Sequence, residues 1–391
     1  MVRGNRGWAA AVAALVGLGA AAPAAAAGGG WAQAGYDAAN GGYNPVEDVL
    51  NAGSVDRLRP RWRVTSPTVP EYSCINQGPP VLADGRAFHP DQRGFAALAA
   101  GSGRVLWRHD VEDPMDTTTP RLAVAGGLLV AASSDCQSVS DPNGTLAAYD
   151  ARSGVRRWQL RRDAPMHTMV VAGGLAIVSG VDPSTTAEVT AYRVGDGRRA
   201  WAVPRALNAA PVAAGGRLLL TREDAPAPGA VAVSARTGRV LWQTRRAWEV
   251  LAADPAGGTF YAREGAALLA VRADSGRVRW SAPVLGGIAR PSVAADGRRV
   301  FVGGGAALTA LAAASGRRDW SVPLGGAVGR PTRAGGLVYA AVAGGALAIR
   351  AAATGRAVPG APALRGTVGH AVVADGTLYA ADGVRLAAYR P

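Results

Sequence analysis

Short apolar runs of four to six residues, separated by Gly-Gly or Asp-Gly pairs, follow one another along most of the chain. No stretch shows the 3.6-residue apolar period of an amphipathic helix, so the pattern predicts β-strands. Such pairs supply the positive φ angles of tight turns, so each is expected to be a two-residue hairpin. The eight predicted turns are Asp84-Gly85, Gly126-Gly127, Gly173-Gly174, Gly215-Gly216, Gly257-Gly258, Asp296-Gly297, Gly335-Gly336 and Asp375-Gly376.

A second signal recurs about every forty residues, which is the sequence signature of a repeat architecture. It consists of an alanine, a glycine six positions later and a tryptophan ten positions later. A long repeat built only of strands predicts a propeller of four-stranded blades rather than a helical solenoid. The copies are Ala97/Gly103/Trp107, Ala148/Gly154/Trp158, Ala191/Gly197/Trp201, Ala232/Gly238/Trp242, Ala270/Gly276/Trp280, Ala310/Gly316/Trp320 and a decayed Ile349/Gly355/Pro359.

The chain has eight turn pairs but only seven copies of the Ala-Gly-Trp unit, and this difference predicts how the ring closes. The chain ends at residues 386–391, where an eighth copy would begin, and a spare tryptophan strand, Arg59 to Val64, lies near the start. This strand is expected to complete the last blade and remove the exposed sheet edges. We therefore predict an all-β, eight-bladed propeller, closed by an N-terminal strand around Trp62.

The repeated tryptophans are expected to lie on the outer strands. A large apolar face there suits packing between neighbouring blades, and the alternative is a ligand-stacking platform. The outer position favours the structural role. The tryptophans concerned are Trp62, Trp107, Trp158, Trp201, Trp242, Trp280 and Trp320.

The Ala-x5-Gly-x3-Trp unit resembles the tryptophan-docking motif of propellers of the pyrroloquinoline-quinone (PQQ) type. The N-terminal run Trp31–Asp37 with Tyr43-Asn44-Pro45 also resembles that family. The resemblance covers about residues 31–391 and implies a quinoprotein-like propeller. The motif is specific for this fold and not for a cofactor. The family's usual aspartate at the third motif position is present only as Asp150.

The first residues of the chain suggest export. Residues 1–27 carry Arg3 and Arg6, an apolar run and Ala25-Ala26-Ala27, which is typical of a signal peptide. Residues 28–58 are then expected to form an N-terminal segment and residues 59–391 a single propeller domain. The mature protein is expected to be secreted, extracellular or periplasmic, monomeric and without a membrane span.

The charge is strongly positive. All 42 basic residues are arginine against 28 acidic ones, and without Arg3 and Arg6 the net charge is +12. This favours anionic partners, and a composition rich in arginine throughout is the alternative explanation. No basic run is interleaved with aromatic residues, so a nucleic-acid partner is not expected.

The two cysteines, Cys74 and Cys136, lie in a chain that the first residues mark for export, where pairing is the default. Cys74 is expected in the loop before blade 1 and Cys136 in the loop after the second strand of blade 2. Both loop classes emerge on the same face of a propeller, so we predict a disulfide there.

Three consecutive blades place a basic residue just before the inner strand: Arg290, Arg330 and His370. Inner strands line the central channel, so these residues are expected near its mouth as a candidate anion site. Inheritance by duplication is the alternative.

The loops on the predicted disulfide face are long only in blades 1 to 4, and insertions of this kind concentrate on a binding face. The chain lacks the adjacent cysteines and the calcium ligand set that the PQQ resemblance would bring, so neither PQQ nor calcium is expected. No catalytic or metal-binding residue stands out. The sequence therefore predicts a non-catalytic scaffold that binds a protein or an anionic envelope polymer; the alternative is a degenerate quinoprotein oxidoreductase or another extracellular enzyme using the channel.

Overall fold

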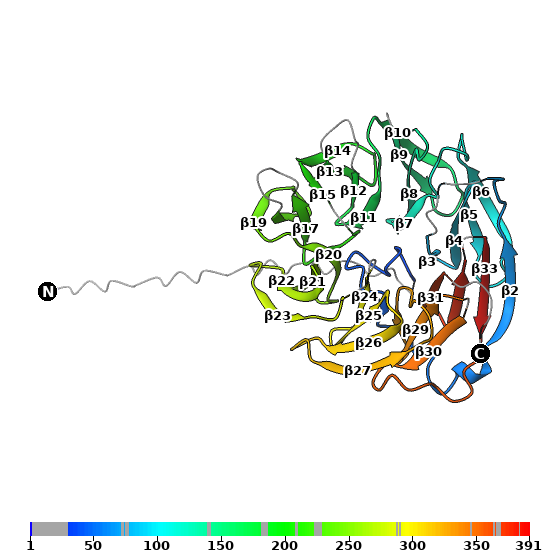
Figure 1. The fold of residues 1–391 in the computed structure, drawn as a ribbon. Helices are drawn as coiled ribbons and strands as arrows, with labels where there is room; N and C mark the ends of the chain where they lie inside the picture. Colours follow the sequence, from blue (N-terminus) through cyan, green and yellow to red (C-terminus); the bar gives the residue numbers. More distant parts are fainter. Residues whose placement is uncertain are drawn as a thin grey trace.

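Eight β-sheets stand around a common centre in the structure of this chain, a computed structural model (Figure 1). Seven are antiparallel throughout, and the eighth includes one parallel pair. This confirms the eight-bladed propeller. The residues described are Met1, 30–71, 74, 78–138, 142–180, 187–207, 210–222, 229–286, 288, 291–344, 346–362, 364, 369–382 and 384–391. The predicted signal peptide lies almost wholly outside them.

Blades 1 to 6 take their strands in chain order from the channel outward. Blade 1 has β3 (Val81–Ala83), β4 (Arg86–Asp91), β5 (Gly94–Ala99) and β6 (Val105–Asp110); blade 2 has β7 (Arg121–Ala125), β8 (Leu128–Ser134), β9 (Gly144–Asp150) and β10 (Arg156–Arg162); blade 3 has β11 (Thr168–Ala172), β12 (Leu175–Gly180), β13 (Glu188–Arg193) and β14 (Arg199–Pro204). Blade 4 has β15 (Ala206–Leu207), β16 (Ala213–Ala214), β17 (Arg217–Arg222), β18 (Gly229–Ser234) and β19 (Val240–Thr244); blade 5 has β20 (Glu249–Ala253), β21 (Thr259–Glu264), β22 (Ala267–Arg272) and β23 (Val278–Ala282); blade 6 has β24 (Ser292–Ala295), β25 (Arg299–Gly303), β26 (Ala307–Ala312) and β27 (Arg318–Pro323).

The last two blades use strands from both ends of the chain. Blade 7 has β28 (Thr332–Ala334), β29 (Leu337–Val342) and β30 (Ala346–Ala351), with β1 (Tyr43–Asn44) parallel to β28 on the channel side; blade 8 has β31 (His370–Ala374), β32 (Thr377–Ala381), β33 (Arg385–Arg390) and β2 (Arg59–Thr65). In blade 8, β2 pairs antiparallel with β33, and Trp62 faces Ala388. The predicted closure by the strand around Trp62 is therefore confirmed.

Six of the eight predicted hairpin turns have positive φ at both residues, for example Gly126 (57°) and Gly127 (74°). The prediction of two-residue turns is wrong in blades 5 and 6, where β20 and β21 are joined by residues 254–258 and β24 and β25 by residues 296–298. An aspartate stabilises each longer turn: the Asp254 carboxylate accepts the Thr259 N–H (3.1 Å), and the Asp296 carboxylate accepts that of Arg299 (2.7 Å).

Neighbouring blades are joined by one repeated contact. The indole of Trp158 in blade 2 donates its Nε1–H to the Val194 carbonyl of blade 3 (2.8 Å), and its ring lies against Gly197. A β-carbon on Gly197 would lie 2.7 Å from the ring, so the motif needs glycine there. Six other pairs repeat this contact: Trp62/Gly103, Trp107/Gly154, Trp201/Gly238, Trp242/Gly276, Trp280/Gly316 and Trp320/Gly355.

The seam between blades 7 and 8 has Pro359 at the tryptophan position, and residues 45–58 pack there instead. Leu50, Val55 and Leu58 join a buried apolar cluster with Tyr339 of blade 7 and Val373 of blade 8. This segment contains η1 (Val55–Arg57), a single turn of 3₁₀ helix. Residues 45–58, which precede the closing strand β2, thus replace the missing tryptophan contact.

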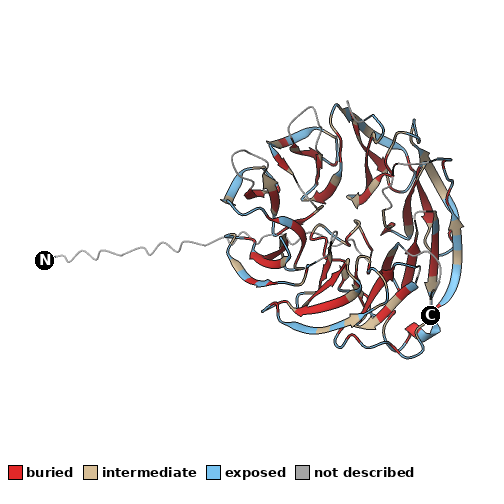
Figure 2. Ribbon diagram, in the orientation of Figure 1, coloured by how far each residue is buried: buried red, intermediate tan, exposed pale blue. Residues whose placement is uncertain are grey.

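Buried residues concentrate on the inner three strands of each blade, whereas the outer strands alternate with exposed positions (Figure 2). The core is therefore divided into clusters that lie between adjacent blades. Within the described chain, no helix has the length and apolar character needed to cross a membrane.

Candidate functional site

The centre of the ring contains residues 31–44, called here the central segment, which runs as the dark blue trace through the middle of Figure 1. It bonds to the inner strand of every blade in turn. Its partners from blade 1 to blade 8 are Leu82, Val124, Val171, Ala213, Ala253, Ala295, Arg333 and Val373, at 2.7 to 2.9 Å. Six of these contacts join backbone to backbone, and Gln33 and Asn44 make the other two through their side chains.

The local sequence allows this path because it is rich in small residues. Tyr36 and Asn40 have positive φ (82° and 55°), which bends the segment around the axis. At Gly35 a β-carbon would meet both Asn40 and the Arg330 guanidinium, so only glycine fits between them. The central segment is therefore a fixed part of the channel wall.

Arg330 binds the central segment through hydrogen bonds to Asn40. Its Nη2 donates to the Asn40 carbonyl (2.6 Å) and to Asn40 Oδ1 (2.7 Å), and burial lowers the pKa of Arg330 to about 10. Asn40 also donates Nδ2–H to the Leu251 carbonyl (3.0 Å). Arg330 stays protonated at neutral pH and holds a buried turn of the chain.

Of the other two predicted anion-site residues, Arg290 lies outside the described residues, and His370 begins β31 and is half-buried. Arg330 and His370 each lie five positions before the hairpin turn of their blade. A site made of all three residues remains a prediction.

A cavity of about 150 Å³ lies at the channel mouth on the face of the long loops. The central segment forms one wall through Gln33, Ala34, Gly35, Asp37 and Asn40, and blades 1 to 4 form the others. The residues from the blades are Gly78, Pro79, Pro90, Thr119, Pro120, Arg121, Leu122, Met169 and Pro211.

Arg121 is the basic residue of this cavity, and the sequence reasoning missed it. It begins β7 and lies five positions before the Gly126-Gly127 turn, as Arg330 does before Gly335-Gly336. The residue five positions before each hairpin turn would have identified Arg121, whereas the similarity of the loops before Arg290, Arg330 and His370 does not extend to it. Burial lowers the pKa of Arg121.

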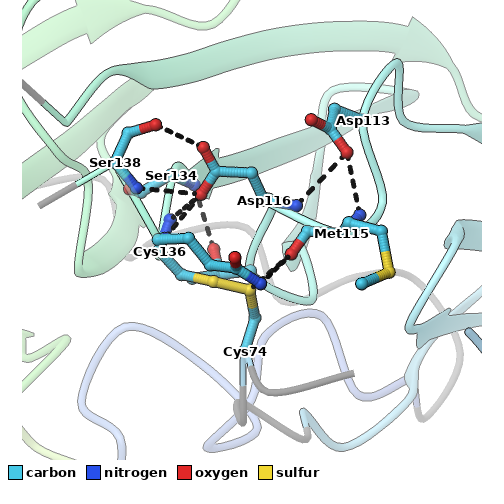
Figure 3. Close-up of a disulfide and its surroundings, with 9 residues drawn as sticks. Cys74, Asp113, Met115, Asp116, Ser134, Cys136 and Ser138 are labelled. Carbon is cyan, nitrogen blue, oxygen red and sulfur yellow. Dashed lines mark hydrogen bonds between the residues drawn. A yellow bond between two sulfur atoms is a disulfide. The ribbon is translucent and has the colours of Figure 1, made fainter. Parts of the chain in front are cut away.

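A disulfide joins Cys74, which precedes blade 1, to Cys136, which follows β8 of blade 2, with Cα atoms 5.8 Å apart (Figure 3). Asp116 orders the loop after β8, because its Oδ1 accepts the N–H groups of Cys136 (2.9 Å) and Ser138 (3.2 Å). Desolvation alone would raise the pKa of Asp116, but these bonds and the Ser138 hydroxyl lower it. Asp116 thus fixes residues 136–138 next to the disulfide.

The family model described as "Outer membrane protein assembly factor BamB" matches residues 51–205, 170–290 and 285–391. The chain belongs to this family. No curated protein matches it by sequence.

Solved structures with the same fold include both dehydrogenases and BamB. BamB from Moraxella catarrhalis has 16% identity and a TM-score of 0.58, with 85% of this chain and 98% of that chain covered. The quinohemoprotein alcohol dehydrogenase ADHIIG from Pseudomonas putida HK5 has 15% identity and a TM-score of 0.67, covering 93% and 80%. A europium-containing methanol dehydrogenase has 12% identity and a TM-score of 0.68, covering 90% and 89%.

The cavity does not fit PQQ, the cofactor of the quinoproteins whose propeller this chain resembles. A cavity of about 150 Å³ is the size that holds one benzene-sized molecule, whereas PQQ has three fused rings and three carboxylates. Arg121 is the one cation among the lining residues, and the central segment fills the space around the axis.

Proposed function

We propose that the protein is a non-catalytic scaffold that binds a protein partner at the cell envelope through its disulfide face. The disulfide face is defined as the loops that precede the inner strands and follow the second strands. The observation that carries the proposal is the central segment, which bonds to the inner strands of all eight blades. A channel crossed in this way favours a support for binding over an open reaction site.

Three further features support it. Membership of the BamB family favours a role in binding other proteins. The disulfide and Asp116 fix residues 136–138 on this face, and preorganisation of this kind strengthens association. Met115 lies next to Asp116 in the connection between β6 and β7, on the disulfide face, and its 39% exposed side chain offers a partner an apolar contact there.

The exported location rests on the N-terminal sequence and on the disulfide, which forms in oxidising compartments. The net charge of +12 without Arg3 and Arg6 favours a partner with an acidic surface. An anionic envelope polymer is the other partner class that this charge would suit.

Site-specific photo-crosslinking tests the proposal. A photoreactive amino acid replaces Met115 on the disulfide face or, as a matched control, exposed Arg236 on the opposite face, and cells are irradiated. We expect a discrete protein adduct from position 115 and none from position 236. Equal labelling from both positions, or no adduct from either, would contradict a specific partner on this face.

A further inference from the structure

The cavity at the channel mouth has mainly apolar walls. Four prolines, Leu122 and Met169 line most of it, and the prolines come from three different blades, at Pro79, Pro90, Pro120 and Pro211. Ligand pockets of proteins have this character, with apolar surroundings and few polar groups that fix orientation. The polar groups of the lining therefore determine which ligand fits.

Three of these polar side chains already form hydrogen bonds within the protein. Both ends of the Gln33 amide are bonded to Val171, at 2.8 Å each, and Asn40 is bonded to Leu251 and Arg330. The Asp37 carboxylate accepts the Ala39 N–H (2.9 Å). They form a fixed wall rather than adaptable ligand contacts.

Arg121 differs from them. Within the described ranges, no hydrogen bond or ion pair reaches its guanidinium, and burial without a neighbouring carboxylate lowers its pKa. A half-buried guanidinium that lacks a counter-ion is costly, because the protein has removed part of its hydration without replacing it. A bound anion would supply the missing partner.

A titratable side chain of the next blade lies within electrostatic reach of Arg121. Partial burial and then the charge of Arg121 lower the pKa of His167, the residue just before β11 in the next blade. The pKa of His167 thus reports the local positive potential. An anion bound at Arg121 would cancel that potential and raise the pKa of His167.

We propose that this cavity binds a small carboxylic acid with an apolar body, its carboxylate on the Arg121 guanidinium and its hydrocarbon part against the prolines. The planar guanidinium matches the two oxygens of a carboxylate. A phosphate would bring more charge and more oxygens than one arginine among apolar walls can satisfy. The volume of about 150 Å³ limits the body to about one small ring. This site goes beyond the proposed function, since it requires no protein partner.

The test uses the mature chain and cyclopentanecarboxylate as the probe, with the neutral cyclopentanecarboxamide as its matched control. Binding is followed by NMR of the His167 ring, which is assigned with His167→Asn among the four histidines of the chain. We expect a saturable shift and a raised His167 pKa with the acid. The amide is expected to bind at least about tenfold more weakly, since it lacks the charge-assisted bond.

Arg121→Gln is expected to weaken binding of the acid roughly ten- to a hundredfold and to raise the His167 pKa without ligand, because the nearby cation is gone. Arg236→Gln, which removes one exposed charge on the other face, should leave both unchanged. If Arg121→Gln does not fold, the proposal is tested by comparing the affinities of the wild-type protein for the acid and for the amide. Equal affinity for acid and amide, no saturable shift, or unaltered affinity in folded Arg121→Gln would overturn the proposal.

A peptide that ends in a leucine carboxylate, compared with its amidated form, identifies the source of the ligand. Tighter binding of the free-acid peptide than of cyclopentanecarboxylate assigns the cavity to a polypeptide C-terminus. Tighter binding of the small acid assigns it to a free metabolite. Either result supports a carboxylate site at Arg121.

Discussion

Trp62 lies against Gly103, and the two residues come from opposite sides of the ring closure. Trp62 belongs to β2, the strand supplied by the N-terminal part of the chain, and Gly103 to the first blade. The Trp62 Nε1–H also donates to the Ala100 carbonyl (2.9 Å). This contact is where blade 8 docks on blade 1.

Gly103→Ala is expected to destabilise the protein by about 1–3 kcal/mol, because Gly103 has φ of 71° and its β-carbon would lie 2.7 Å from the Trp62 ring. Gly101→Ala is the matched control, since nothing lies within 4 Å of a β-carbon there. Urea unfolding measures both. In a Trp62→Ala background, the loss of unfolding free energy caused by Gly103→Ala should fall to the part that comes from backbone strain. An undiminished loss in that background would mean that contact between Trp62 and Gly103 does not close the ring.

The seam between blades 7 and 8 depends on Glu47, a buried carboxylate in the segment that replaces the missing tryptophan. Its oxygens accept the N–H groups of Leu50 (2.8 Å) and Gly376 (3.0 Å). Glu47→Ala removes two bonds to a charged group and should cost roughly 2–4 kcal/mol. The exposed neighbour Asp48 is the control, and Asp48→Ala should change the unfolding free energy by less than about 0.5 kcal/mol. Similar losses in both variants would argue against this role.

Much of the ring could be predicted from the sequence because its elements repeat. The Ala-Gly-Trp spacing and the turn pairs gave the blade number, and the count of copies located the strand around Trp62. The longer turns after Asp254 and Asp296 were missed because their aspartates bond to backbone N–H groups, which a dipeptide pattern does not reveal.

The central segment could not be predicted. It has no repeat, and its bonds run mostly through the backbone to eight separate blades, so its residue types carry little of the information. Arg121 was missed for a different reason: its register matches Arg330, but the loop before it does not resemble the loop before Arg330. Its proposed role depends on the proline-lined cavity, which forms only where four blades and the central segment meet.

His89 in β4 gives a pH prediction. It is 1% exposed, neither ring nitrogen has a partner within the described chain, and burial lowers its pKa to about 4, against the opposing effect of Asp91 and Asp382. The folded pKa lies below the unfolded value of about 6.5, so this stability is present above pH 6.5 and is lost as the pH falls towards 4.

Wild type should therefore lose about 2.5 kcal/mol more than His89→Leu between pH 7.5 and pH 4.5, as measured by urea unfolding. The comparison with the variant removes the contributions of other groups. The same loss in both proteins would show that His89 is not protonated on unfolding in this range.

The disulfide closes a loop between residues 62 positions apart. Replacing Cys74 and Cys136 by serine should lower the unfolding free energy by at most about 4 kcal/mol, through the entropy of the unfolded chain. Mass mapping of the exported protein under non-reducing conditions checks the pair itself. Free thiols in that protein would refute the pairing, and undiminished photo-crosslinking from position 115 in the serine variant would show that the disulfide does not organise the binding face.

The central claim is that the central segment makes this propeller a binding scaffold rather than a quinoprotein. Titration of the mature protein with PQQ and Ca²⁺, followed by absorbance after desalting, tests it most directly. We predict no stoichiometric retention of the quinone and no dye-linked oxidation of alcohols. A bound chromophore at one equivalent, with alcohol-dependent dye reduction, would contradict the claim.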